Sequence, residues 1–416
     1  MTSVAAARAA QRRWEPVSLR RRLAVAAHLR AMIAEHAAEL ARLAAAPNDR
    51  PVAEKMVSEV IPLLDACRFL EREAPRILHA RKFGKRRRPF WLRGSSFTVE
   101  RRPFGVILIV GPRNYPLFLP AVQMLQAMVA GNAVLLKPAE NCSAPVRWLA
   151  EQLFAADLVE RDLLQLLPEP PASAQQAVRA GVEKVIFTGS SENGRRLLAL
   201  MAERNTPGVF ELSGADCVFV RQDADLERAA RAIAFGRRLN AGETCMAPQI
   251  ILAHSAVAAR LTECLRALDF RELEVRTFAD DRAALDLSRQ MEFGLGAAIF
   301  SADESAAHAF ARQLPTGFVT INDLIVPTAD PRFPFGGVRA SGFGTTRGAE
   351  GLLEMTYPHV IATRRARWLP HLDETPAGSE DIFEAYVKTA YGTGVGRRLK
   401  ALGQLLGAAK KARRLK

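Results

Sequence analysis

Short apolar runs alternate with stretches of helical periodicity between residues 104 and 203, and this alternation restricts the fold more than any other feature. Residues 104–112 (FGVILIVGP), 130–140 (AGNAVLLKPAE) and 182–190 (VEKVIFTGS) each hold a continuous apolar run that ends at glycine, proline or a polar residue. Such runs are typical of parallel strands buried on both faces. Helical patterns between them predict crossover connections, and therefore a doubly wound parallel sheet.

The ends of these three runs carry the polar and glycine residues of the region. The clusters lie at residues 111–114, 137–140 and 188–194. Ligands of doubly wound sheets bind outside the carboxyl ends of the strands. The three clusters therefore predict one ligand crevice.

From residue 208 a second unit of short strands and helices follows. We predict two short strands within 209–220 and further strands at 249–253, 273–278, 296–303 and 317–323. We predict helices at 226–239, 255–268, 283–291 and 304–313, and we expect Ser255 to cap the second of these helices. A long glycine-rich loop at residues 330–344 ends the unit. Before the first sheet, residues 20–43 and 57–69 show helical spacing, and residues 89–103 indicate a hairpin or an extended arm.

Composition excludes several classes of protein. Hydrophobic residues make up 49% of the 416 residues, as in globular chains, and no apolar run is long enough to span a bilayer. The first residues do not have the pattern of a secretory signal. Five widely spaced cysteines without a CxxC pair argue against a disulfide framework and a zinc site, so we expect no metal and a cytoplasmic location.

The net charge of +14 is compatible with an anionic ligand, nucleic acid or a membrane surface. Basic residues cluster at 82–88 and at 397–416, and the second cluster predicts a basic amphipathic helix that either lies on an anionic membrane or packs on the protein surface. Phe83 is the one aromatic residue in the two clusters, and neither cluster has a recognisable reading module, which argues against nucleic-acid binding.

A single cysteine, Cys245, lies in a short run of small and polar residues, 239–249 (LNAGETCMAPQ), between two apolar stretches. A ligand can reach a thiol on such a turn, and a backbone N–H can approach the atom that the sulfur attacks. Free cysteine is also among the most buried residue types, so this stretch alone leaves a packing role open.

Other candidate residues also have two readings. Asn114 can donate to a developing oxyanion or simply form a turn. Apolar neighbours would raise the pKa of Glu211 and suit a general base, although strand alternation also allows an exposed position. The glycine turn at 188–194 can bind a pyrophosphate or form a tight connection. Lys137 and Glu140 can bind ribose hydroxyls or one another.

Eight ordered segments resemble the aldehyde dehydrogenase superfamily, and most closely its short class, which includes fatty aldehyde dehydrogenases. The segments are FGVILIVGPRNYP, AGNAVLLKPAE, VIFTGSSENG, FELSG, NAGETC, GLGAAIFS, TIND and PFGGVRASGFG. They follow the family's order and cover about residues 20–365. The resemblance implies oxidation of an aldehyde to the carboxylic acid through a cysteine thiohemiacetal and a thioester.

The resemblance also implies roles for the matching positions. Cys245 resembles the nucleophile, Asn114 with the Cys245 backbone N–H resembles the oxyanion hole, and Glu211 resembles the base that activates water. The implied contacts to NAD or NADP are Lys137, Glu140, Gly189, Ser190, Gly194 and Phe335.

The sequence departs from the family at four places. Arg113 replaces the usual aromatic residue, and Ser213 replaces the first residue of a Gly-Gly pair. Glu243 replaces the usual Gln, and an acidic neighbour can raise the pKa of the Cys245 thiol. The family's Glu-x-Phe-Gly-Pro motif, whose Glu binds the nicotinamide ribose, is absent, and residues 269–272 (DFRE) stand in its place. Glu272 or another carboxylate would then have to make this contact.

We therefore predict an α/β fold with a doubly wound parallel-sheet cofactor domain, a second α/β catalytic domain and a small β oligomerisation arm. The predicted bounds are 1–88 and 104–210 for the NAD(P)-binding domain, 89–103 and 356–365 for the arm, 211–355 for the catalytic domain, shortened between 254 and 273, and 366–416 for a basic C-terminal tail. The expected protein is a homodimeric enzyme for apolar, long-chain aldehydes whose tail contacts a membrane. The alternative is a catalytically impaired relative that keeps the scaffold for binding or assembly.

Overall fold

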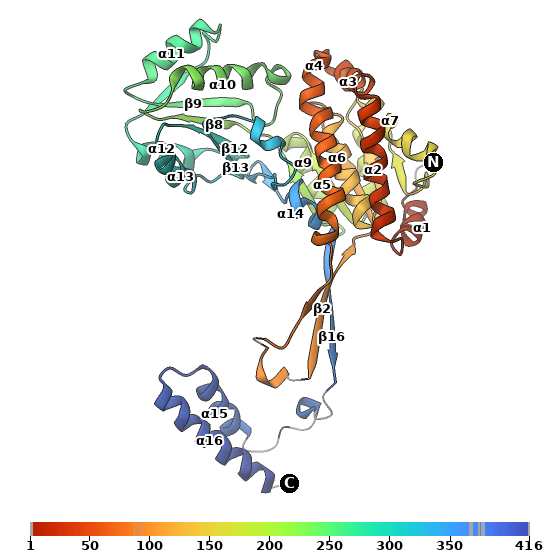
Figure 1. The fold of residues 1–416 in the computed structure, drawn as a ribbon, viewed down its shortest axis with the longest axis vertical. Helices are drawn as coiled ribbons and strands as arrows, with labels where there is room; N and C mark the ends of the chain where they lie inside the picture. Colours follow the sequence, from red (N-terminus) through yellow and green to blue (C-terminus); the bar gives the residue numbers. More distant parts are fainter. Residues whose placement is uncertain are drawn as a thin grey trace. The chain divides into compact units, whose positions relative to one another are not determined.

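The computed structural model describes residues 3–86, 88–92, 94–365, 369–372, 375 and 379–414. The chain divides into two compact units, one of Met1–Arg81 with Val99–Val360 and one of Lys82–Thr98 with Ile361–Lys416. The first unit holds two parallel sheets and the helices that cover them (Figure 1). The predicted candidate site residues all belong to this first unit.

The first sheet has six strands in the order β15-β7-β6-β3-β4-β5. The strands are β3 (Val106–Val110), β4 (Ala133–Lys137), β5 (Leu164–Leu166), β6 (Lys184–Thr188), β7 (Gly208–Glu211) and β15 (Gly342–Phe343). All neighbours pair in parallel except β15, which runs antiparallel to β7. Every residue of β3, β4 and β6 is buried, as the continuous apolar runs predict. The doubly wound parallel sheet is confirmed.

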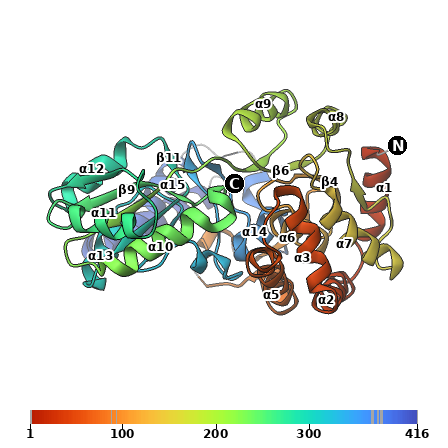
Figure 2. The same ribbon diagram turned by 90° about the horizontal axis from the view of Figure 1, so that it is seen from above.

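Helices cover both faces of this sheet. Figure 2 shows α8 and α9 on one side of the strands and α2 and α5 on the other. The helices are α1 (Val4–Trp14), α2 (Leu19–Glu35), α3 (Ala37–Ala45), α4 (Val52–Lys55), α5 (Ile61–Ile77), α6 (Phe118–Ala130), α7 (Ser143–Ala155), α8 (Pro171–Ala180) and α9 (Ser191–Ala202). All residues of α6 are buried, so this helix forms the centre of the core between the sheet and the amino-terminal helices.

The second sheet has five parallel strands in the order β10-β9-β8-β12-β13. The strands are β8 (Asp216–Val220), β9 (Pro248–His254), β10 (Val275–Phe278), β12 (Gly296–Phe300) and β13 (Phe318–Ile321). Helices α10 (Leu226–Arg238) and α11 (Ala258–Ala267) pack on one face, and α12 (Asp281–Gln290) and α13 (Glu304–Ala311) pack on the other. Alternate residues of β8 enter the two cores, with Val218 on one face and Phe219 on the other.

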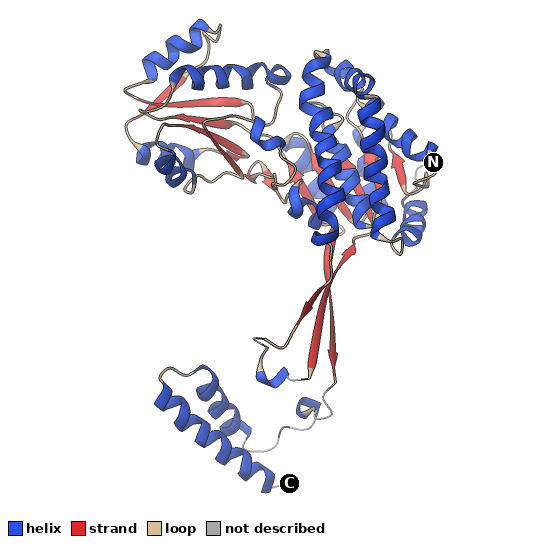
Figure 3. Cartoon of the chain, in the orientation of Figure 1, coloured by secondary structure: helices blue, strands red, loops and turns tan. Residues whose placement is uncertain are grey.

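Smaller elements complete the described chain (Figure 3). Strands β11 (Phe293–Gly294) and β14 (Val338–Arg339) pair antiparallel, and helix α14 (Gly348–Glu354) follows β15. A three-stranded sheet joins β1 (Arg81–Phe83), β2 (Ser95–Pro103) and β16 (Thr356–Arg364) in the order β1-β2-β16. The second unit contains α15 (Ser379–Tyr391) and α16 (Val395–Arg414).

Several predicted boundaries are wrong. The helical pattern of residues 20–43 breaks at His36 into α2 and α3, and Ser255 does not cap a helix, because α11 begins only after Val257. The pattern of residues 57–69 starts in a π-helix, Met56–Val60. The C-terminal tail predicted at residues 366–416 includes 366–368, 373–374, 376–378 and 415–416, which lie outside the described residues.

Candidate active site

The Cys245 turn follows helix α10 and leads into strand β9. Asn240 and Ala241 have φ values of 52° and 54°, so the chain reverses sharply through the left-handed region just before the cysteine. Gly214 lies against this turn, because a Cβ added at Gly214 would come 2.4 Å from the carbonyl oxygen of Cys245. The thiol is free and half-buried. The tertiary fold, more than local sequence, fixes its position.

Glu211, the last residue of β7, faces the thiol. The Sγ of Cys245 donates to Oε1 of Glu211 across 3.4 Å, while Oε2 is buried and has no partner among the described residues. Only 2% of Glu211 is exposed, so the alternative of an exposed strand residue is excluded. Burial raises the pKa of the Glu211 carboxyl, and the guanidinium of Arg347 opposes this change.

The pKa of the Cys245 thiol is raised well above its ordinary value. Burial is the largest cause, and the carboxylates of Glu211 and Asp216 add to it. Glu243, which the sequence suggested as the acidic neighbour, is exposed and is not among the causes. The resting thiol is therefore neutral, and its proton points at Glu211.

Arg347 is a site residue that the sequence did not indicate. Its Cζ lies 4.1 Å from the ring centroid of Phe335, and its guanidinium donates to the carbonyl oxygen of Thr328. The side chain is buried, and burial lowers the pKa of the guanidinium while Glu211 and Cys245 raise it. Arg347 is the N-cap residue of α14, after the glycine-rich loop. No periodic pattern in the sequence marks this position, because only the tertiary fold turns the side chain inward.

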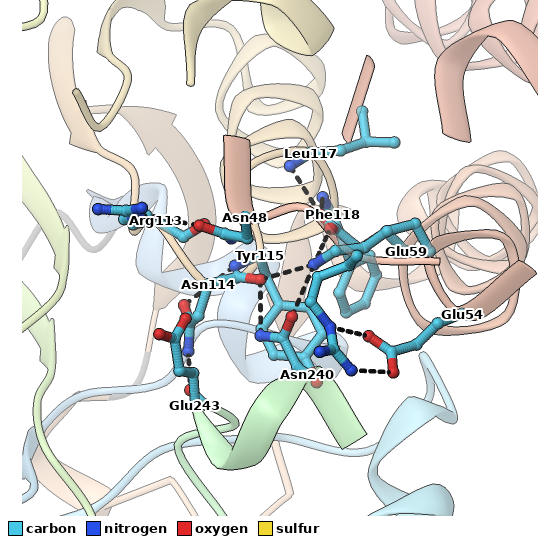
Figure 4. Close-up of polar contacts among 12 residues, drawn as sticks. Asn48, Glu54, Glu59, Arg113, Asn114, Tyr115, Leu117, Phe118, Asn240 and Glu243 are labelled. Atoms are coloured by element: carbon cyan, nitrogen blue, oxygen red, sulfur yellow. Dashed lines mark hydrogen bonds and ion pairs between the residues drawn. The ribbon is translucent and has the colours of Figure 1, made fainter. Parts of the chain in front are cut away.

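Asn114 lies beside the Cys245 turn, at the end of β3. Its Nδ2 donates to the carbonyl oxygen of Glu243 at 2.7 Å, and its Oδ1 accepts from the backbone N–H of Tyr115 at 3.0 Å (Figure 4). The side-chain amide carries a second N–H, and the backbone N–H of Cys245 makes no hydrogen bond within the described part of the chain. Both groups therefore remain able to donate.

Two hollows meet at the cysteine. One is an apolar cavity of about 210 Å³, whose lining includes Val57, Pro62, Phe118, Phe235, Ile325 and Phe335. The other is a polar cleft of about 690 Å³ along the carboxyl ends of β3, β4 and β6. Glu211, Thr244 and Cys245 line both. A molecule in the cavity and a molecule in the cleft would therefore meet at the thiol.

The cleft brings together most of the predicted cofactor contacts. Lys137 and Glu140 line it from the end of β4, and Gly189 and Ser190 line it from the turn between β6 and α9. Ser190 caps α9, because its hydroxyl accepts from the backbone N–H of Asn193 at 3.3 Å. The structure thus places a helix amino terminus in the cleft, where it favours an anion.

The donors of the cleft fit a dinucleotide. Lys137 is buried at 6% exposure, forms no ion pair with Glu140 within the described residues, and keeps its ammonium for another partner. Burial lowers the pKa of that ammonium, and Glu140 and Glu169 raise it. A Cβ at Gly189 would come 2.9 Å from the Phe187 ring, so glycine lets the turn pass close to the strand. Side chains and turn together leave room for pyrophosphate and ribose groups.

Three expected residues lie elsewhere. Gly194 is buried in the first turn of α9, where its backbone N–H donates to Ser190 and an added Cβ would come 2.5 Å from Leu212. Phe335 lines the apolar cavity and not the cleft. Glu272 is exposed and does not line the cleft. Gly194 therefore serves close packing, and Phe335 contributes to the cavity wall.

The comparison with known proteins decides the family. The sequence profile of the Aldehyde dehydrogenase family matches residues 2–269 and 273–361. The chain belongs to this family. It is an NAD(P)-dependent aldehyde dehydrogenase by the activity of that family.

Two relatives and one solved structure illustrate the family membership of this aldehyde dehydrogenase. It is 28% identical to 4,4'-diapolycopene aldehyde oxidase of Methylomonas sp, over 82% of this chain and 77% of that protein. It is 26% identical to the dimeric NADP-preferring aldehyde dehydrogenase of Rattus norvegicus, over 59% of this chain and 68% of that protein. The fold is similar to that of Mycobacterium tuberculosis aldehyde dehydrogenase complexed with NAD+, with a TM-score of 0.80, 21% identity, and coverage of 88% of this chain and 90% of that one.

Within the described ranges, no group of three or more His, Cys, Asp or Glu side chains is arranged to hold a metal ion. Of the helices that the structure describes, none is both long and apolar enough to cross a membrane.

Proposed function

We propose that Cys245 is the nucleophile that captures the aldehyde, with Glu211 as its proton acceptor and Asn114 as the donor to the developing oxyanion. The proposal rests mainly on one observation. The Sγ of Cys245 is 3.4 Å from Oε1 of Glu211, and both residues line the apolar cavity and the polar cleft. Substrate carbon and cofactor can then reach the same sulfur from opposite sides.

The chain's own groups support each chemical step. Glu211 accepts the thiol proton as Sγ bonds to the aldehyde carbon, and the carbonyl oxygen becomes an alkoxide. The second N–H of Asn114 and the backbone N–H of Cys245 stabilise that oxygen. In the later step Glu211 takes a proton from water, whose oxygen attacks the thioester carbon and releases the Cys245 thiolate and the carboxylic acid.

NAD(P)+, when bound, supplies the two-electron oxidation by accepting a hydride from the substrate carbon. Lys137, Glu140, Gly189 and Ser190 would hold it in the cleft. The raised pKa of Glu211 suits a base that must accept a proton and release it again in every cycle.

The substrate that fits best is an apolar aldehyde. Aliphatic and aromatic side chains form most of the cavity lining, and the diapolycopene aldehyde oxidase relative carries an extended apolar substrate in its name. Apolar chains gain about 0.8 kcal/mol per buried CH₂, so affinity rises with chain length while the cavity has room.

A substrate series tests this function. Purified protein is incubated with NAD+ or NADP+ and aldehydes from propanal to dodecanal, and NADH or NADPH absorbance is followed. We expect kcat/KM to rise with chain length. Absence of reduced cofactor with every aldehyde and both cofactors would contradict an active enzyme, and a preference for propanal would contradict the apolar substrate.

We also propose that the protein forms a homodimer through the arm of strands β2 and β16. Strand β16 pairs only with β2 among the described strands, and it exposes Tyr357, Val360 and Ile361 at 41%, 58% and 42%. An open apolar edge favours strand addition by a second chain. Sedimentation should give a dimer at micromolar concentration, and Ile361→Lys should shift it toward monomer. A native monomer would exclude this arrangement.

We also propose that α16 contacts anionic lipid. Its described sequence has no acidic residue, and it exposes Val395, Leu399 and Leu406 at 76%, 62% and 64%. Spacing of four and seven residues places these side chains on one helix face. Co-sedimentation with phosphatidylglycerol vesicles at low salt tests the contact, with phosphatidylcholine vesicles as control. Equal recovery with both vesicle types would contradict it.

A further inference from the structure

A buried ion pair lies behind the active site. It joins Lys55, the last residue of α4, to Glu59 in the π-helix that follows directly. Lys55 Nζ is 2.9 Å from Oε1 of Glu59, and neither side chain is exposed. Glu59 Oε2 accepts from the backbone N–H groups of Leu117 and Phe118 at 2.7 and 3.0 Å. The carboxylate therefore holds the beginning of α6, the helix that follows the Asn114 loop (Figure 4).

The ammonium of this pair joins the two loops of the active site. Lys55 Nζ donates to the backbone carbonyl of Asn114 at 2.9 Å and to Oδ1 of Asn240 at 3.0 Å. Asn240, which is 1% exposed, also donates from Nδ2 to the same Asn114 carbonyl at 2.9 Å. One cation thus fixes the separation between the Asn114 loop and the Cys245 turn.

Two further hydrogen bonds connect the Asn114 loop with the residues next to Cys245. Asn114 Nδ2 donates to the Glu243 carbonyl, and the hydroxyls of Tyr115 and Thr244 bond at 2.8 Å. Both bonds join the loop that holds the oxyanion donor to residues directly before Cys245. The two loops come from different sheets, so no local backbone constraint holds them in register.

Lys55 lines neither the apolar cavity nor the polar cleft, and so it cannot touch substrate or cofactor. We propose that Lys55 is a positioning residue that holds the Asn114 amide and the Cys245 thiol at the separation needed for attack. The inference rests on the proposed roles of Cys245 and Asn114. Misplacement of reacting groups by about 1 Å can cost on the order of 100-fold in rate, which makes such a link measurable.

The test must separate positioning from folding. Lys55→Met alone leaves the Glu59 carboxylate buried without its cation, which destabilises the fold strongly. The double variant Lys55→Met with Glu59→Gln removes both charges and keeps an oxygen that accepts from Leu117 and Phe118. Asn240→Gly removes the other end of the link, and glycine tolerates the left-handed φ of this position.

Lys184 offers a matched control. It is 4% exposed, its Nζ pairs with Glu354 at 2.5 Å, and it donates to the Glu354 carbonyl at 2.6 Å, at the opposite end of β6 from the cleft. Lys184→Met therefore also removes a buried ammonium from its carboxylate partner, although the Glu354 side chain is 32% exposed, and it touches neither loop. Each variant is measured for melting temperature, for kcat per titrated Cys245 thiol, and for the KM of cofactor and aldehyde.

For the double variant and for Asn240→Gly we expect kcat to fall by on the order of 100-fold while both KM values stay within about threefold, because the walls of cavity and cleft are kept. Lys184→Met should have a lower melting temperature than the native protein but the same kcat. A kcat within about threefold of native in the double variant overturns the inference. If that variant does not fold, the same result in Asn240→Gly overturns it. If Cys245→Ala is inactive while the double variant and Asn240→Gly are fully active, the assignment of Cys245 as nucleophile stands and only the positioning role of Lys55 is rejected.

Discussion

The thiol of Cys245 donates to Oε1 of Glu211 across 3.4 Å, at the boundary between an apolar cavity and a polar cleft. The thiol is neutral because burial and two carboxylates raise its pKa, and the carboxyl has a raised pKa because it is buried. Nucleophile and base therefore start the cycle as one hydrogen-bonded pair, and substitutions of either member have separable consequences.

Replacement of the nucleophile should remove activity and little else. We expect Cys245→Ala to lower kcat/KM by on the order of 10⁴-fold, because no other group can form the thioester. Cys264→Ala is the control, since Cys264 is also a free, half-buried thiol but lies on α11, away from both hollows. Reduced cofactor is followed by absorbance. Similar activities for the two variants would contradict the assignment.

Replacement of the base should slow both steps in which Glu211 accepts a proton, which are capture of the aldehyde and hydrolysis of the thioester. Glu211→Gln keeps the shape of the side chain but cannot take a proton from water, so steady-state turnover should fall by roughly 100- to 1000-fold. The first equivalent of reduced cofactor should also form more slowly than in the native protein, because the Cys245 thiol has lost its proton acceptor, and stopped-flow absorbance measures this rate. Native-like steady-state turnover would show that another group activates water.

Arg347 should set the acidic limb of the pH–rate profile. Activity rises with pH as the Glu211 carboxyl, whose pKa burial raises, loses its proton. The guanidinium of Arg347 favours the ionised carboxylate, so Arg347→Met should raise the Glu211 pKa further and move the limb to higher pH by about one unit. The measurement is kcat/KM against pH for both proteins. A limb that stays in place or moves to lower pH would contradict this electrostatic role.

Gly214 should tolerate no side chain. A Cβ there would come 2.4 Å from the Cys245 carbonyl oxygen, which is backbone and cannot rotate away. We expect Gly214→Ala to lower the free energy of unfolding by about 1–3 kcal/mol and to reduce kcat. Gly403→Ala, on α16 with nothing within 4 Å of the added Cβ, is the matched control and should lose neither. Chemical denaturation and steady-state kinetics measure both.

Asp216 should make stability fall as pH rises. Burial raises its pKa from 3.8 to about 7, so the folded state binds this proton more tightly than the unfolded state does. Its contribution is therefore present below pH 3.8 and is lost between pH 3.8 and about 7. Relative to Asp216→Asn, the native protein should lose a few kcal/mol of unfolding free energy between pH 4 and pH 8, measured by urea titration. Parallel pH curves for the two proteins would contradict this.

The parts of the fold that local patterns determine were predictable. Strands β3, β4 and β6 are continuous apolar runs because both faces are buried, and their short length and flanking glycine or proline favour a strand over a helix. Helix ends were less predictable, since Ser255 has the chemistry of a cap but donates its backbone N–H to the Phe278 carbonyl, which holds it in the preceding turn. Tertiary pairing prevailed over local preference there.

Buried charged residues were the main failure of sequence reasoning. Lys55 and Glu59 stand four residues apart in a helical pattern, where such pairs are ordinarily exposed, and Arg347 stands in a loop without periodicity. Lys55 and Glu59 pair with one another, and residues distant in the sequence supply their remaining hydrogen bonds and cover them. The ordered motifs indicated Cys245 and Glu211, whose side chains the structure brings into contact, because a family resemblance records such long-range partners indirectly.

The sequence by itself determined the parallel sheet that begins at residue 104, the α/β character of the region from residue 208 onward and the residue types at the strand ends, because these follow from local apolar runs and turn chemistry. Only the tertiary structure decided that Glu211 faces Cys245, that Phe335 enters the cavity wall and not the cleft, and that Lys55 joins the two loops. These relationships depend on how β7, the Cys245 turn and the amino-terminal helices pack, and such long-range packing leaves no periodic signal in any one stretch.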